Sequence, residues 1–180
     1  MSQKSRSQSE VIYVAYVASS IDGRISESSR SKLGWTSKED WDFFQKSLLG
    51  FDAVVVGYNT YEMARKNLSK RNTIVFTSRV NTPNRSGSVT FLNPKKYDLN
   101  KLIKEKGYKK IAILGGPKIY NYFLEQKLLN ELFVTIEPYV FTNGVSMFAG
   151  ERFRKYRFSL EWVKKLNTKG TILLKYKYGN

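Results

Sequence analysis

The fold of this chain is most strongly constrained by its pattern of short apolar runs. These runs alternate with stretches whose apolar residues recur at helical spacing. Residues 11–19 (VIYVAYVAS) are almost continuously apolar and rich in β-branched side chains, and residues 53–56 and 110–114 have the same character. A strand that is apolar on both faces belongs inside a sheet that is covered on both sides. Since such strands alternate with helices in parallel α/β folds, we expect a mostly parallel central sheet flanked by helices.

The helical segments carry recognisable start signals. Apolar side chains recur at helical spacing within residues 38–49, from Trp41 to Leu49, and Thr36 or Ser37 stands at the N-cap position. Further helices are expected at residues 60–66, 98–106 and 117–126, and further strands at residues 73–77, 88–92 and 132–136.

The end of the chain has a different pattern. Residues 157–166 and 171–178 alternate between apolar and polar side chains, and a short turn joins them, which predicts a C-terminal antiparallel hairpin. Residues 1–10 (MSQKSRSQSE) are polar, and we expect them to form a flexible tail. No linker or repeat interrupts residues 11–180, so a single domain is predicted there.

Composition narrows the chemistry. The chain of 180 residues contains no His and no Cys, which excludes thiol nucleophiles, Ser-His-Asp triads, Cys/His zinc sites and disulfides. We therefore expect no metal, and acid–base chemistry from carboxylates, Lys, Tyr, water or a cofactor. The lack of Cys favours the cytoplasm, and no apolar run approaches the ~20 residues of a membrane span.

The charge is strongly positive, because 31 Lys and Arg residues face 15 Asp and Glu residues, a net charge of +16. Such a surface keeps a protein soluble, and it also attracts phosphate-rich ligands or nucleic acid. No nucleic-acid-binding motif accompanies the charge, so the sequence does not favour a nucleic-acid partner. The charge by itself does not decide between a soluble surface and a site for anionic ligands.

Glycines follow two of the apolar strands at the point where a helix begins. Gly57 ends residues 53–56, and Gly115-Gly116 follows residues 110–114, with Pro117 at the first helical position. Ligands of parallel sheets bind at the carboxyl ends of the strands, and glycines allow the backbone to approach phosphate there. The Rossmann fingerprint is absent, so a dinucleotide site here would be of another kind.

Several segments together resemble the dihydrofolate reductase-like superfamily, and within it the reductase domain of bacterial riboflavin-pathway deaminase-reductases. The resemblance covers residues 11–178. It is carried by SIDGRI (residues 20–25), GWTS (34–37), VGYNTYE (56–62), Gly115-Gly116 with Tyr120, and ELFVTIEP (131–138).

The resemblance implies NADPH-dependent hydride transfer and a set of residues around the cofactor. Thr60 would hold phosphate at a helix start, and Thr77-Ser78-Arg79 would hold the adenosine 2′-phosphate, for which the Arg79 guanidinium is chemically suited. The other implied cofactor residues are Ala18, Gly57, Gly115, Gly116, Lys118, Ile119 and Tyr120.

The resemblance also implies an acid and a substrate region. Asp40 stands where dihydrofolate reductases carry their active-site carboxylate and Thr135 where they carry its hydroxyl partner; a first-turn helix charge is the alternative for Asp40. The implied substrate residues are Asp22, Arg24, Trp35 and Phe44, although an Asp-Gly turn and a core aromatic are the alternatives for Asp22 and Phe44.

The expected function is reduction of a pyrimidine-type intermediate of riboflavin biosynthesis by NADPH, in a homodimer. This chain departs from both kinds of enzyme at one place each. Riboflavin-pathway reductases usually have an Arg-rich first helix, where this chain has Trp41-Asp42-Phe43-Phe44, and dihydrofolate reductases usually have an Arg where this chain has Tyr58. Dihydrofolate reductase is the alternative enzyme, and a basic nucleic-acid-binding domain is the non-enzymatic alternative.

Overall fold

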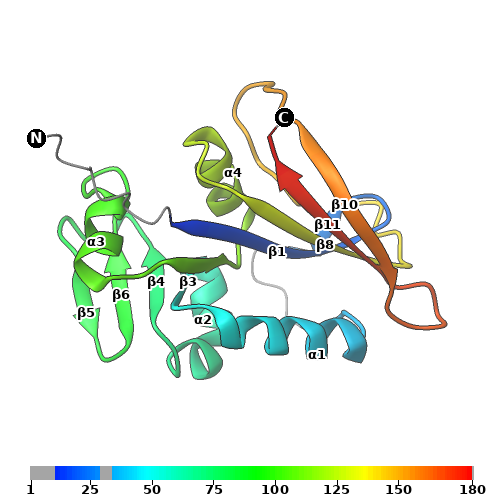
Figure 1. Ribbon diagram of the computed structural model, residues 1–180, viewed down its shortest axis with the longest axis horizontal. Helices are drawn as coiled ribbons and strands as arrows, with labels where there is room; N and C mark the ends of the chain where they lie inside the picture. The colour runs from blue at the N-terminus through cyan, green and yellow to red at the C-terminus, as the bar shows by residue number, and fades with distance from the viewer. Residues whose placement is uncertain (1–10, 29–33, 180) are drawn as a thin grey trace, which may run out of the picture.

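The computed structural model describes residues 11–28 and 34–179, so the expected tail at residues 1–10 lies outside the described residues. One nine-stranded sheet runs through the molecule in the order β10-β11-β8-β1-β7-β3-β4-β6-β5 (Figure 1). Its parallel strands are β1 (Ile12–Ser20), β3 (Ala53–Gly57), β4 (Thr73–Phe76), β6 (Val89–Leu92), β7 (Lys110–Ile113) and β8 (Glu131–Glu137).

Antiparallel strands close both edges of this sheet. β5 (Asn84–Ser86) pairs with β6 at one edge, and the hairpin of β10 (Phe158–Lys165) and β11 (Ile172–Tyr178) pairs with β8 at the other. The predicted mostly parallel sheet with a C-terminal hairpin is therefore confirmed. A second, two-stranded sheet joins β2 (Arg24–Ser26) to β9 (Val145–Ser146).

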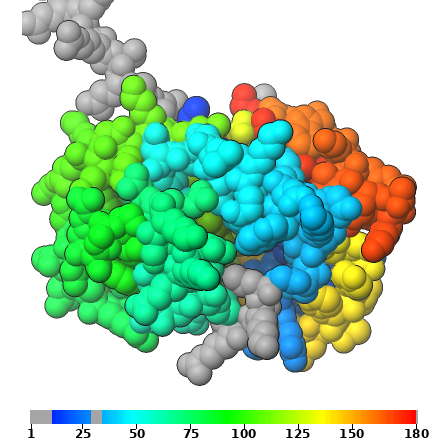
Figure 2. Space-filling view, turned by 90° about the horizontal axis from the view of Figure 1, so that it is seen from below, coloured from blue at the N-terminus to red at the C-terminus, as the bar shows by residue number. Residues whose placement is uncertain are grey.

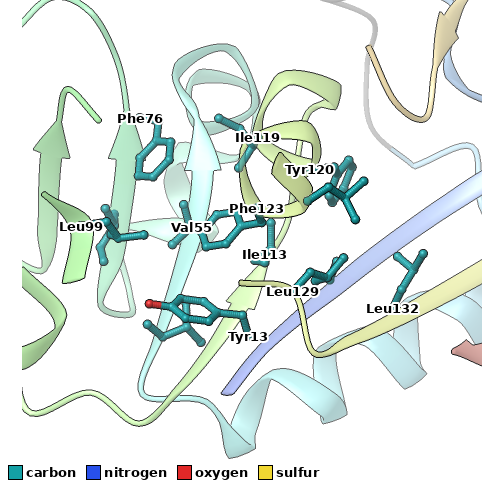
Figure 3. Close-up of a cluster of buried hydrophobic side chains, with 14 of the residues drawn as sticks. Tyr13, Val55, Phe76, Leu99, Ile113, Ile119, Tyr120, Phe123, Leu129 and Leu132 are labelled. Atoms are coloured by element: carbon teal, nitrogen blue, oxygen red, sulfur yellow. The ribbon is translucent and has the colours of Figure 1, made fainter. Parts of the chain in front are cut away.

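Helices cover both faces of the sheet. α3 (Leu99–Lys106) and α4 (Pro117–Glu125) pack on one face, where Phe123 of α4 lies against Tyr13 of β1 at a ring distance of 5.2 Å (Figure 3). α1 (Lys38–Ser47), a 3-10 turn (Leu48–Gly50) and α2 (Tyr58–Leu68) pack on the other face, which Figure 2 views. The continuous apolar strands predicted this arrangement, because β3 is buried on both of its faces.

The structure differs from the sequence-based boundaries in instructive places. The helix predicted over residues 38–49 ends at Ser47, and Leu49 in the following 3-10 turn is 83% exposed, so it does not extend the apolar stripe. α2 begins two residues earlier than predicted, at Tyr58. β10 is the edge strand, so its alternation of side chains does not mark a buried face.

Within residues 11–28 and 34–179, no helix has the length and apolar character that crossing a membrane requires. The same residues contain no cluster of acidic side chains that could hold a metal ion.

Candidate active site

A cavity of about 990 Å³ lies at the carboxyl ends of the parallel strands, where α1, α2 and the start of α4 all contribute lining residues. Val17 and Ala18 of β1, Gly57 of β3 and Thr135 of β8 line its floor. This is the position that parallel α/β sheets generally use for ligands, because the strand ends and the following loops leave a crevice there.

Aromatic side chains form one wall of the cavity. Tyr16 stacks on Phe133 with ring centroids 4.9 Å apart and an interplanar angle of 5°, and Phe43 and Phe44 of α1 pack against Tyr16 at 6.2 and 5.9 Å. Phe44 therefore belongs both to the cavity wall and to the core under α1. A wall of this kind suits a flat ring, since aromatic faces stack on planar ligands.

Asp40 is the only acidic side chain among the described residues that line the cavity. It sits in the first turn of α1, and its backbone N–H donates to the Oγ of the N-cap residue Ser37 at 3.3 Å. The side chain is buried, whereas a first-turn charge that serves only the helix dipole would face solvent.

Burial raises the pKa of the Asp40 carboxyl above its usual range, and the nearby negative charge of Glu137 raises it further. Hydrogen bonds with Thr135 and Thr36 act in the opposite direction on this pKa. A carboxyl in an apolar cavity whose pKa is raised by burial can keep a proton at a higher pH than an exposed one.

The two glycine junctions meet beside the cavity. The Gly57 N–H donates to the Gly115 carbonyl oxygen at 2.8 Å, and a methyl group on Gly116 would lie 3.9 Å from Thr60 Oγ1. Gly57 and Gly116 are the N-cap residues of α2 and α4, and neither offers a side-chain acceptor to the N–H groups of the first turn. Such adjacent helix starts form a cradle that suits a phosphate group.

Both the backbone conformation of Gly115 and the closeness of Tyr120 require a glycine at this position. Its φ is +90°, in the region that favours glycine, and a methyl group there would lie 2.7 Å from Tyr120 Oη. The hydroxyl of Tyr120 donates to the Tyr16 carbonyl oxygen at 2.6 Å, which ties α4 to β1 under the cavity.

Most of the expected cofactor residues come together. Ala18, Gly57, Thr60, Gly116, Lys118, Ile119 and Tyr120 all line the cavity, and Gly115 lies directly behind them.

Thr77-Ser78-Arg79 does not reach the main cavity. Arg79 borders a smaller hollow with Tyr58 and Asn59, two residues that also line the main cavity, and its guanidinium lies 3.9 Å from the centre of the Tyr58 ring. Thr77 Oγ1 accepts the Arg79 backbone N–H at 3.2 Å, so its hydroxyl stabilises the turn.

The expected substrate residues divide into two groups. Trp35 and Phe44 line the cavity, and Trp35 Nε1 donates to the Ile25 carbonyl oxygen at 3.1 Å. Asp22 and Arg24, the other two implied substrate residues, are not among the residues that line it.

Asp22 and Arg24 instead hold two loops together. The Asp22 carboxylate accepts the Ser20 hydroxyl at 2.6 Å and the Phe141 N–H at 3.0 Å. Arg24 Nη1 donates to Ser146 Oγ at 2.6 Å, across the β2–β9 sheet. Their role follows from these contacts, because they fix the loop after β8 to the turn after β1.

The sequence did not single out two polar side chains of the site. Arg71 lines the cavity and donates to the Leu48 carbonyl oxygen at 3.4 Å, although in the sequence it belongs to an ordinary basic pair, Lys70-Arg71. Glu137 is 2% exposed and lies two residues after Thr135 on β8. Two-residue spacing on a strand is the one signal that places it on the same face as Thr135.

Comparison with known proteins identifies the family of this chain. A sequence profile described as dihydrofolate reductase matches residues 14–167. The chain belongs to the dihydrofolate reductase family. A dihydrofolate reductase of Ureaplasma parvum is 30% identical over 99 residues, which are 54% of this chain and 59% of that protein.

Two solved structures share the dihydrofolate reductase-like fold. A pyrimidine reductase-like protein of Corynebacterium diphtheriae superimposes with a TM-score of 0.75 at 18% identity, over 96% of this chain and 93% of that one. RibD of Acinetobacter baumannii gives a TM-score of 0.76 at 20% identity, over 97% of this chain but only 60% of that chain. The predicted membership of the dihydrofolate reductase-like superfamily is thus confirmed.

Proposed function

We propose that this protein is an NADPH-dependent reductase of a flat, nitrogen-containing heterocycle, and that a phosphorylated pyrimidine intermediate of riboflavin biosynthesis is its first candidate substrate. The observation that carries the proposal is Asp40, one buried carboxyl in an aromatic-walled cavity that two helix starts without side-chain caps also border. One face of such a cavity suits a planar ring and the other suits a dinucleotide.

The residues on the glycine side fit NADPH, which supplies a hydride to the substrate when it is bound. Gly57 and Gly116 let the backbone approach phosphate, and the Thr60 hydroxyl and the Lys118 ammonium add polar contacts at the same place. Arg79 lies in the adjoining hollow, where its guanidinium would pair with a 2′-phosphate that NADH lacks.

Asp40 would hold the proton that a substrate nitrogen needs when a hydride reaches the carbon bonded to it. Its raised pKa favours the protonated form, and Thr135 orients the carboxyl by a hydrogen bond. The aromatic wall around Tyr16 would limit the access of water to this proton.

Arg71 favours a substrate with an anionic tail. It and Lys118 are the only cationic side chains among the described residues of the cavity, and Lys118 belongs to the cofactor side. A guanidinium pairs with phosphate or with carboxylate, so Arg71 fits both the phosphorylated pyrimidine and the glutamate tail of dihydrofolate. Dihydrofolate is therefore the second candidate, which the dihydrofolate reductase profile also supports.

The test follows NADPH loss at the absorbance band of the reduced nicotinamide, with each candidate substrate offered in turn. We expect oxidation with one of the two. No oxidation with either, together with no NADPH binding, would contradict the reductase proposal and leave the basic nucleic-acid-binding domain as the alternative to test.

A second experiment addresses Asp40. Asp40→Asn should slow hydride transfer most in the pH range in which the wild-type Asp40 keeps its proton, and the difference should shrink at higher pH, where the wild-type carboxyl is ionised as well. NADPH binding should stay intact. An unchanged pH–rate profile would remove Asp40 from the acid role. The homodimer also stays a prediction, which light scattering of the purified protein tests.

A further inference from the structure

A second buried carboxylate lies behind the cavity, and it does not touch the space that substrate would occupy. Glu137 is 2% exposed at the end of β8, on the same face of the strand as Thr135. Among the described residues, no Lys or Arg lies within ion-pair distance of it. Because a buried charge is costly unless it is hydrogen-bonded, this carboxylate needs a structural explanation.

Both oxygens of Glu137 accept hydrogen bonds from other elements. Oε1 accepts the backbone N–H of Ser37 at 2.6 Å, and Oε2 accepts the hydroxyl of Thr171 at 2.7 Å. Ser37 is the N-cap of α1, and Thr171 immediately precedes β11. One side chain thus joins β8, the start of α1 and the start of β11.

The direction of the Thr171 hydroxyl is fixed by Asn167. The Asn167 side-chain oxygen accepts the backbone N–H groups of Lys169 and Thr171 at 3.0 and 3.2 Å, so its amide nitrogen must donate. That nitrogen donates to Thr171 Oγ1 at 2.9 Å. The Thr171 proton is therefore free to point at Glu137, and two donors on two oxygens suit an ionised carboxylate, which only accepts.

Ser37 connects Glu137 to the acid of the site. Its N–H donates to Glu137, while its Oγ accepts the N–H of Asp40. A displacement of Ser37 would move the first turn of α1, and with it the Asp40 carboxyl relative to Thr135.

We propose that Glu137 is a positioning residue for Asp40, which holds the start of α1 against β8 and presents a fixed negative charge behind the acid. The proposal rests on the function proposed above. Its consequence is that Asp40 keeps its proton at higher pH than it would beside a neutral residue, because ionisation would place two like charges together.

Other charges around Glu137 do not supply the same effect. On α1, Lys38 and Glu39 are exposed, and on the β10–β11 turn Lys169 is exposed. Asp22 and Arg24, after β1, lie within 3.9 Å of each other and largely offset one another. Solvent screens exposed charges, whereas the buried Glu137 is not screened in this way.

The test measures the Asp40 pKa directly, by carboxyl carbon NMR of the whole protein labelled at aspartate, so it needs neither NADPH nor substrate. Glu137→Gln keeps the size of the side chain and removes its charge, and Glu39→Gln removes a neighbouring but exposed charge as the matched control. We expect a lower Asp40 pKa in E137Q and a wild-type value in E39Q. An unchanged pKa in E137Q, or an equal fall in E39Q, would overturn the proposal.

Kinetics then separate this inference from the proposed function. If the protein is a reductase, E137Q should lose activity at a lower pH than the wild type, with rates about tenfold lower on the alkaline side for each unit by which the Asp40 pKa falls. A reductase whose pH profile is the same in E137Q refutes the role of Glu137 alone. A protein with no reductase activity but with the expected NMR result refutes the proposed function alone.

A further variant serves if E137Q does not fold. Thr171→Val keeps the shape of the side chain and the charge of Glu137 but removes one of its two hydrogen bonds. Hydrogen exchange of the Ser37 N–H should be slow in the wild type and about fivefold faster in T171V, since one net hydrogen bond contributes roughly 1 kcal/mol. An unprotected Ser37 N–H in the wild type would overturn the positioning role.

Discussion

The two adjacent glycines after β7 should differ strongly in how much an alanine substitution destabilises the fold. Gly115→Ala places a methyl group 2.7 Å from Tyr120 Oη and 2.9 Å from two atoms of its ring, at a φ of +90°. Gly116→Ala places a methyl group 3.9 Å from its nearest neighbour, Thr60 Oγ1, at a φ of −75° that any residue adopts. The pair tests whether the backbone beside the cavity is as tightly packed as the structure indicates.

The magnitudes follow from the two geometries. A left-handed φ costs an L-residue about 1–2 kcal/mol, and forcing extra atoms into a packed region costs about 1–3 kcal/mol. G115A should therefore lower the free energy of unfolding by about 2–5 kcal/mol, whereas G116A should change it by less than about 1 kcal/mol. For a domain of this size, even the lower bound for G115A corresponds to a fall of at least about 4 °C in Tm.

Thermal and urea unfolding of both variants measure this difference, and NADPH titration adds a second contrast. G116A should remain folded but bind NADPH at least about tenfold more weakly, because its methyl group occupies space that the backbone leaves for phosphate. The reasoning is refuted if G115A unfolds like the wild type, or if G116A loses as much stability as G115A.

Three further predictions concern charged side chains of the site. Burial raises the pKa of the Asp40 carboxyl in the folded protein, so stability is lost as the pH rises from the unfolded-state pKa through the folded-state pKa. Asp40→Asn removes this loss, so it should raise Tm at about pH 8, with a smaller gain at about pH 4. Equal gains at both values would contradict this linkage. Arg79→Ala should weaken NADPH about ten- to a hundredfold and NADH much less in binding titrations, and equal losses would exclude a 2′-phosphate contact. Arg71→Gln should raise KM for the anionic substrate about tenfold or more with the NADPH Kd unchanged; an unaltered KM would remove the substrate's tail from Arg71.

The sheet could be predicted because its central strands are continuous apolar runs in the sequence. β3 and β7 lie between neighbours on both sides and under helices on both faces, so nearly every side chain must be apolar, and the sequence shows this directly. The short strands β2, β5 and β9 have two or three residues each, too few for a period to be seen. Their pairing depends on contacts with distant segments.

The site was predictable in part for the same reason. Gly57, Gly116 and Thr60 belong to junctions whose order is visible in the chain, and Asp40 follows Trp35 by five residues, in the first helix after the Trp35 loop. Arg71 and Glu137 could not be found, because a basic pair and a charge at a strand end ordinarily face solvent. The sequence suggested Asp22 and Arg24 as substrate-binding residues. Their hydrogen bonds go instead to Phe141 and Ser146, which lie more than a hundred residues away in the chain.

We propose that the cavity holds NADPH and its substrate during hydride transfer and that Asp40 protonates the substrate. The most direct measurement is a single turnover with NADPH that carries deuterium at the transferred position, using the phosphorylated pyrimidine and dihydrofolate separately. We predict deuterium in the reduced product of one substrate, and a slower transfer in Asp40→Asn at neutral pH. Absence of deuterium from both products, or transfer in Asp40→Asn as fast as in the wild type, would contradict the account.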